Sequence, residues 1–599
     1  MTASNPALPV PTTHDTPAPL TPLVARRTVL ASLLGLATAG LAVSASPRAL
    51  AAPPTASGAS HSLWANADDT TRIRLLDRVT WGNTAAGAQA LSTGSAAGVA
   101  SYLAAQLRPG PATLPPEAQA RIDAMTITRT PADALAIDMA ARQRAARAQP
   151  TEDDRKAALK DWQQDMRALQ QEASERFVLR ALYSPTQLRE KMTWFWMNHF
   201  NVFGGKGNLR AMVGDYEDRA VRPHALGRFR DLLGATARHP AMLLYLDNAQ
   251  NAAGRINENY ARELMELHTL GVGGGYTQAD VQELARVLTG MGVSLRPLGS
   301  EAPRMRPALQ GRYVREGLFE FNPQRHDWGT KTLLGAPLRA EGLAEVDEAL
   351  DRLARAPATA RFVTHKMAVF MVGDKPSSAL LQQLAQTFER TEGDIAAVLQ
   401  VLFETPEFEA SLGQRFRDPV HYVLAGMRLA HGDAVVPSAA PALGWLQRLA
   451  EPLYGRATPD GYPLDAAPWS GSGQMNTRFE IARAMGAGAG ARDVSGTSGR
   501  AAQTGEMGQM GQMGKVIEEN NTPASTRASS PSSQSPAGSS PMPAKPSAPS
   551  VKPPALAQTD YARALLPTWS AATRDALAQA TSPRDWNLLF LASPEFMHG

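Results

Sequence analysis

The segment Asn257–Val281, "NENYARELMELHTLGVGGGYTQADV", contains the signals that decide the fold. Asn257 is a preferred residue type at a helix N-terminus, and Gly271 is a preferred residue type just past a helix end. Thr277 and Asp280 have the spacing of a capping box, which starts a second helix. The segment therefore predicts two consecutive helices with a glycine-rich turn between them.

Signals of the same kind continue on both sides of this segment. Apolar residues recur three and four positions apart in residues 341–373 and 378–410, and a capping box at Thr151 starts a long charged helix. Leu318–Gly335 has short β-prone runs around a turn, which predicts a two-stranded hairpin. We therefore predict a mainly α fold: a multi-helix globular body with one small β-hairpin and a long disordered insert near the C-terminus.

The N-terminus has the features of an export signal. Arg26 and Arg27 precede a weakly apolar run, and Ala49, Leu50 and Ala51 fit a cleavage site. This order predicts a twin-arginine signal peptide over residues 1–51 and a periplasmic or secreted mature protein. The apolar run is short and rich in small residues, and no later segment approaches a spanning length, so we expect no transmembrane span in the mature chain.

Changes in composition divide the rest of the chain. Residues 491–556 are low in complexity and rich in Gly, Ser, Pro and Gln, so they cannot bury enough apolar surface to become ordered. The predicted parts are a spacer (52–64), a helical body (65–490), a disordered linker (491–556) and C-terminal helices that pack on the body (557–599).

Composition excludes several classes of function. The chain has 599 residues and no cysteine, which excludes disulfides, thiolate nucleophiles and Cys-ligated metals. A divalent metal would have to bind through His, Asp, Glu, Asn or backbone oxygen. The 60 basic and 56 acidic residues nearly balance, so the chain has no strong field that would attract nucleic acid.

The helix that begins at Asn257 carries the first candidate site. Glu263 and Glu266 share one stripe of this helix, and His268 falls on the opposite side. We predict that Glu263 lines a buried or half-buried polar site with His199 nearby and acts as a metal ligand or general base, supported by Glu266. His268 then packs in the core. The alternative is an ordinary amphipathic helix with its carboxylates in water.

Three other clusters are candidates, and each has a simpler explanation. His199 ends an aromatic-rich helix, where a hydrogen-bonded core histidine is the simpler interpretation. Asp247 and Glu258 lie in an Asn-rich loop whose oxygens suit calcium or magnesium, although turn chemistry explains the loop equally well. His326 and Asp327 form an acid–base pair in the predicted hairpin. The catalytic candidates are thus Glu263, Glu266, His199, His326 and Asp327, and the metal candidates are Asp247, Glu258, Glu263 and His199.

A series of motifs resembles the DUF1800 family of uncharacterised bacterial proteins. Besides Asn257–Val281, the motifs are "LLDRVTWG" (75–82), "WFWMNHFNVF" (194–203), "YLDNAQN" (245–251), "ARVLTG" (285–290), "RHDWGTKTLLG" (325–335) and "TPDGYP" (458–463). The resemblance covers about residues 70–490 and the C-terminal tail. It implies an exported protein and a DUF1501-type neighbour in the cell envelope, and it assigns no catalytic role to any residue.

Two functions therefore remain open. The first is an exported hydrolase-like or metal-dependent enzyme, in which the helix carboxylates, His199 and the His326–Asp327 pair share one polar cleft. The second is a non-catalytic binding or assembly factor that acts with an envelope partner such as a DUF1501-type protein. Convergence of the candidate residues in a concave pocket favours the enzyme, and their scatter over the molecule favours the binding factor.

Overall fold

The computed structural model describes residues 63–64, 67–92, 96–488 and 552–599. The predicted signal peptide, nearly all of the spacer and residues 491–551 of the predicted linker lie outside the described residues. The described part is mainly helical with a few short strands, which confirms the predicted fold class. None of its helices is both long enough and apolar enough to cross a membrane.

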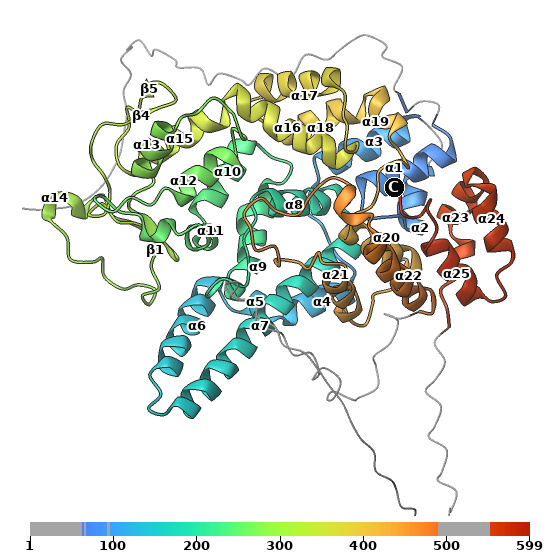
Figure 1. Ribbon diagram of the computed structural model, residues 1–599, viewed down its shortest axis with the longest axis horizontal. Helices are drawn as coiled ribbons and strands as arrows, with labels where there is room; N and C mark the ends of the chain where they lie inside the picture. The colour runs from blue at the N-terminus through green and yellow to red at the C-terminus, as the bar shows by residue number, and fades with distance from the viewer. Residues whose placement is uncertain (1–62, 65–66, 93–95, 489–551) are drawn as a thin grey trace, which may run out of the picture. The chain divides into compact units, whose positions relative to one another are not determined.

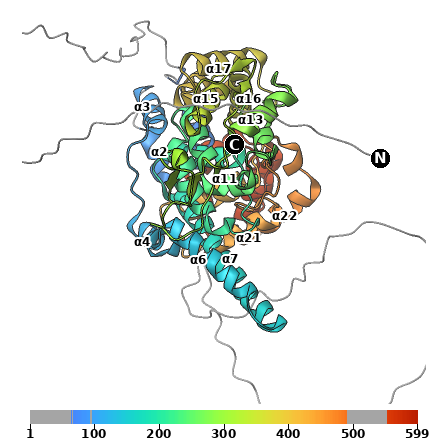
Figure 2. The same cartoon turned by 90° about the vertical axis from the view of Figure 1, so that its left-hand side faces the viewer.

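The described chain up to Tyr183 contains helices and connecting loops but no strand. Its helices are α1 (Asp69–Val79), α2 (Ala85–Ser92), α3 (Ala96–Leu107), α4 (Pro116–Ala124), α5 (Thr126–Arg129), α6 (Ala132–Arg147) and α7 (Glu152–Tyr183). The predicted cap at Thr151 is present, because its side chain accepts a hydrogen bond from the N–H of Asp154. Helices α6 and α7 form a hairpin that extends away from the neighbouring helices in both views (Figures 1 and 2), with Met139 and Trp162 in a small core of their own.

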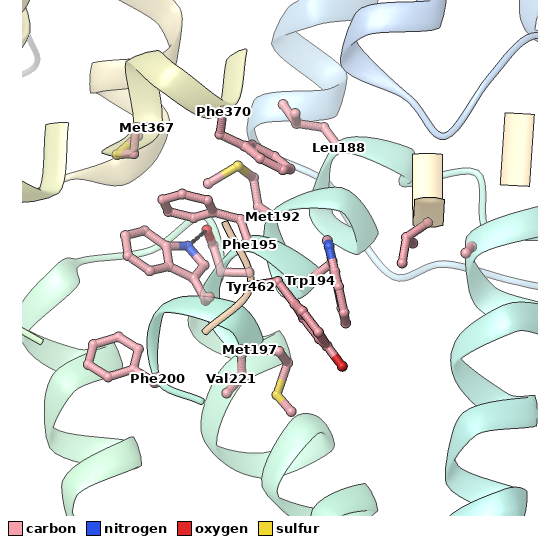
Figure 3. Packing of buried hydrophobic residues seen from close by; sticks show 14 of the residues in the cluster. Leu188, Met192, Trp194, Phe195, Met197, Phe200, Val221, Met367, Phe370 and Tyr462 are labelled. Carbon is pink, nitrogen blue, oxygen red and sulfur yellow. Dashed lines mark hydrogen bonds between the residues drawn. The ribbon is translucent and has the colours of Figure 1, made fainter. Parts of the chain in front are cut away.

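The middle of the chain contains the central helix of the core. Its α-helices are α8 (Gln187–His199), α9 (Val213–Asp215), α10 (Phe229–Arg238), α11 (Pro240–Tyr245), α12 (Asn259–Glu266) and α13 (Gln278–Val287). All residues of α8 except Arg189 are buried. Phe195 and Phe370 have ring centroids 5.1 Å apart, and Trp194 stacks with Tyr462 at 6.3 Å (Figure 3). Aromatic burial on this scale makes α8 the element around which the core is built.

The segment Asn257–Val281 folds as two helices, with one difference from the prediction. The capping box of α13 is present, since the Thr277 side chain accepts from the Asp280 N–H and the Asp280 side chain accepts from the Thr277 N–H. Helix α12, however, ends at Glu266, and the N–H groups of Leu267 and His268 both donate to the carbonyl oxygen of Glu263, at 2.9 and 3.1 Å. The last residues before the glycine turn therefore leave the regular helical path.

The β structure differs from the single predicted hairpin. The strands are β1 (Met291–Val293), β2 (Val314–Glu316), β3 (Phe319–Phe321), β4 (Thr332–Leu333) and β5 (Ala336–Pro337). Strand β3 pairs antiparallel with both β1 and β2, and β4 pairs with β5. Gly317, with φ of 60°, makes the tight turn between β2 and β3. Both edges of β3 are thus occupied, so β3 cannot pair with the strand that follows it.

The remaining helices complete the body and add a C-terminal group. They are α14 (Pro307–Gln310), α15 (Leu343–Ala354), α16 (Pro357–Met371), α17 (Ser378–Arg390), α18 (Ile395–Phe403), α19 (Pro406–Ala410), α20 (Pro419–His431), α21 (Ala440–Arg448), α22 (Ser472–Gly486), α23 (Asp560–Leu565), α24 (Ala571–Ala578) and α25 (Pro583–Leu591). Helix α25 packs against α22, and α23 packs against α1 (Figure 1). The side chain of Asn587 donates to the carbonyl oxygens of Gly486 and Pro554, at 3.0 and 2.8 Å.

Candidate functional site

The candidate pair His326 and Asp327 is held by structural contacts. His326 Nδ1 donates to the carbonyl oxygen of Thr289 at 2.8 Å, and its Nε2 lies 3.3 Å from a carboxylate oxygen of Glu345. Asp327 accepts hydrogen bonds from Arg286 at 2.9 and 3.1 Å. These bonds fasten the loop after β3 to α13 and α15, and the structure does not bring the pair to the α12 carboxylates.

The four metal candidates are not brought together. Asp247 accepts from Lys206 at 2.7 Å, and Glu258 accepts from Gln278 at 2.7 Å. These ion-pair and amide contacts use the oxygens that a cation would need. Within residues 63–64, 67–92, 96–488 and 552–599, no three His, Asp or Glu side chains form a group that could hold a metal ion. The interactions of the loop favour turn chemistry over a cation site.

His199 lies in the core at the end of α8. Its side chain is 2% exposed, and its Nε2 donates to the carbonyl oxygen of His268 at 3.0 Å. Its Nδ1 is buried and has no hydrogen-bond partner. Burial and the nearby charge of Lys366 hold the pKa of His199 well below its usual value. The imidazole is therefore neutral, with one nitrogen free to exchange a proton or a hydrogen bond.

His268 packs in the core, as predicted, and lies beside His199. The two ring centroids are 6.1 Å apart. Helix α12 ends at Glu266, so the angle of 100° per residue does not continue to position 268 and a helical wheel does not determine where this side chain lies. The Nε2 of His268 is buried without a partner, and burial together with the charge of Lys366 lowers its pKa to about 3. The second imidazole is also neutral.

Lys366 of α16 is the third member of this cluster. Burial lowers the pKa of its amine to about 8, although the negative charge of Asp460 opposes the shift. The Nζ atom lies 5.6 Å from the centre of the Phe362 ring. No atom of the described chain accepts a hydrogen bond from it. A lysine in this state loses its proton easily near neutral pH, which suits a general base or a nucleophile.

The loop of residues 458–463, "TPDGYP", is fixed against the end of α8. Asn198 Nδ2 donates to the carbonyl oxygen of Tyr462 at 2.9 Å, and Asn198 Oδ1 accepts from the Tyr462 N–H at 2.6 Å. Gly461, the residue before Tyr462, has φ of 77°, and a Cβ there would come within 2.2 Å of the carbonyl oxygen of Asn198. The paired amide bonds and the glycine together position the neighbouring Asp460.

Asp460 and the α12 glutamates form the acidic side of the site. Glu263 is half-buried, and burial followed by the charges of Glu266 and Asp460 raises its pKa. Burial acts in the same direction on Asp460, but hydrogen bonds from Thr458 and Arg456 hold its pKa below the usual value. The carboxyl of Glu263 thus binds its proton more strongly than an exposed glutamate does, while Asp460 supplies the negative charge that acts on Lys366.

Two members of this cluster, His199 and Glu263, are also candidates from the sequence arguments. Those arguments assigned His268 to structure alone and gave Lys366 and Asp460 no role. Asp460 lies inside the "TPDGYP" motif, which could have drawn attention to it. Lys366 is half-buried, follows the ordinary amphipathic pattern of α16 and carries no local signal, because its neighbours in this cluster come from distant segments of the chain.

The fold and the site together define a mainly helical protein with two neutral buried imidazoles, a lysine of lowered pKa and a facing set of carboxylates. The chain belongs to the family described as Protein of unknown function (DUF1800), whose model matches residues 74–598. No curated protein and no solved structure matches it. The family description names no activity, so a function has to be argued from the site itself.

Proposed function

We propose that this protein is a hydrolase-like enzyme whose site consists of Lys366, His199, His268, Glu263 and Asp460. The observation that carries the proposal is the amine of Lys366, with a pKa of about 8, beside two neutral imidazoles that each have an unpartnered nitrogen. A buried polar atom without a hydrogen bond costs about 1–3 kcal/mol. Perturbed groups that gather in this way are typical of sites that transfer protons.

The chemistry that fits these groups is the hydrolysis of an ester. Neutral Lys366 takes a proton from water, and the water oxygen forms a bond to the carbonyl carbon. When the bond from that carbon to the alcohol oxygen breaks, the departing oxygen takes the proton back from the Lys366 ammonium. The products are an acid and an alcohol, and the lysine returns to its neutral form. Asp460 stabilises the ammonium between the two steps.

Replacement of the amine tests this proposal. The variant Lys366→Met keeps the length and apolar stem of the side chain, and we expect it to lose roughly 100-fold in kcat/KM because the general base is absent. The substrates are 4-nitrophenyl acetate, butyrate and octanoate. The rate of hydrolysis is measured as the release of 4-nitrophenolate. In the unsubstituted protein the rate should rise with pH and level off above about 8, since deprotonation of Lys366 supplies the base.

The control for this experiment is Lys375→Met, which removes an exposed lysine just after α16. It should hydrolyse the esters as the unsubstituted protein does, and both variants should show the same thermal midpoint. Equal activity in Lys366→Met and Lys375→Met would overturn the proposal. Absence of hydrolysis in the unsubstituted protein would favour the non-catalytic alternative, which the structural contacts of His326, Asp327 and Glu258 also favour.

We also propose that the protein is exported through the twin-arginine route and acts in the periplasm or outside the cell. The support is the order of the arginine pair, the weakly apolar run and the Ala-Leu-Ala site in residues 1–51. A chain without cysteine needs no disulfide formation after export, which agrees with transport in the folded state. A DUF1501-type protein remains the envelope partner that we expect.

A further inference from the structure

A mainly apolar cavity lies between the glycine-rich turn and helices α16 and α17. Its volume is about 630 Å³, within the range of small-molecule sites. Polar side chains, among them Arg361 and His365, also line it. The apolar residues that line it are Leu270, Val272, Ala358, Phe362, Leu381 and Ala385.

Phe362 forms the wall between this cavity and the proposed site. Its ring lines the cavity, and the same ring has its centroid 6.2 Å from that of His199 and lies 5.6 Å from the Nζ of Lys366. Gly271, with φ of 81°, lets the ring lie there, because a Cβ at this position would come within 2.6 Å of a Phe362 ring carbon. The Phe362 side chain therefore borders both the cavity and the proposed site.

The exposure and polarity of the residues that line the cavity indicate which kind of ligand could bind there. Val272 is 79% exposed although it is apolar, and it lies in the turn that forms one side of the cavity. Arg361, Gln382 and Glu389 are polar and exposed, so they provide hydrogen-bonding groups beside an apolar interior. A ligand with an apolar body and one polar end matches this distribution of side chains.

We propose that this cavity binds the apolar acyl part of an ester substrate, and that Phe362 turns aside to bring the ester carbonyl to Lys366. The inference rests on the proposed hydrolase-like function, which it deepens by naming the substrate class: esters of apolar, medium-length acids. The apolar lining selects the acyl chain, since removal of each CH₂ from water contributes about 0.8 kcal/mol. Esters of short acids therefore gain little binding free energy from the cavity, and esters with longer acyl chains gain more.

A matched pair of substitutions on α17 tests the inference. Gln382 lines the cavity, and its neighbour Gln383 does not, although both are exposed on the same helix. Gln382→Trp fills the cavity, and we expect it to weaken binding of the neutral apolar probe N-phenyl-1-naphthylamine roughly tenfold, measured by calorimetric titration. It should raise KM for 4-nitrophenyl octanoate by a similar factor. Gln383→Trp should match the unsubstituted protein in every measurement.

The two proposals fail in different ways. Lys366→Met should bind the probe normally while it loses hydrolysis. If Gln382→Trp loses probe binding but the unsubstituted protein hydrolyses no ester, the proposed function falls and the cavity stands as a site for apolar ligands. If the unsubstituted protein hydrolyses the esters and Gln382→Trp changes neither probe binding nor KM, the inference about the cavity is overturned.

Discussion

Gly461 shows how one residue without a side chain can determine where a charged group lies. Its φ of 77° is unfavourable for other residues, and the carbonyl oxygen of Asn198 occupies the space that a Cβ would need. The position of Asp460, and with it the charge opposite Lys366, depends on this close approach. None of this was apparent from the sequence, where Gly461 is one of several turn glycines.

We predict that Gly461→Ala destabilises the protein more than a glycine replacement without a clash. Gly275 has a similar φ of 87° but no atom within 4 Å of a built Cβ, so Gly275→Ala measures the backbone effect alone. We expect about 1 kcal/mol for Gly275→Ala and roughly 3 kcal/mol for Gly461→Ala, from urea unfolding. Equal losses in the two variants would show that the loop moves away from Asn198 without cost.

At the scale of the element, local signals were reliable where a few adjacent residues decide the outcome. The capping box at Thr277 and the cap at Thr151 are both present. The early end of α12 could not be predicted. It arises because the N–H groups of Leu267 and His268 share one acceptor, and no sequence pattern indicates this. The sheet was missed because β1 and β3 pair across more than 20 residues of intervening chain.

The start of α13 allows a direct measurement of the capping box. Thr277→Ala removes the oxygen that accepts from the Asp280 N–H, and we expect a loss of about 1 kcal/mol in the free energy of unfolding. Thr330→Ala, at an exposed loop position whose side chain makes no hydrogen bond to described residues, should change stability by less than about 0.5 kcal/mol. A loss of the same size in both variants would contradict the assigned role of Thr277.

At the scale of the whole molecule, the fold class and the family could be predicted from the sequence, while the proposed site depends on contacts between distant segments. The proposed site joins residues of α8, α12, α16 and the 458–463 loop, and each pair of these segments is far apart along the chain. Lys366 and Asp460 interact only after the chain has folded, which is why no local pattern identified them. The motifs "WFWMNHFNVF", Asn257–Val281 and "TPDGYP" mark three of the four segments, and only α16 carries none.

Export is a property of the whole chain and can be tested on it directly. We expect that replacement of both Arg26 and Arg27 by Lys leaves the precursor in the cytoplasm, because the twin-arginine route depends on this pair. Cell fractionation followed by immunoblotting measures the change. The unsubstituted protein should appear in the periplasmic or secreted fraction, and normal export of the double variant would contradict the assignment.

The packing of α1 against α23 also affects when the protein can fold. The hydroxyl of Thr70 donates to the carbonyl oxygen of Ala564, 494 residues later in the chain. At the usual speed of synthesis, the ribosome takes roughly 25–100 s to make that length. Until then, the side of α1 that faces α23 has no partner, so the N-terminal helices finish folding only after nearly the whole chain has been made. During this interval the nascent chain exposes apolar surface, which makes it prone to aggregation.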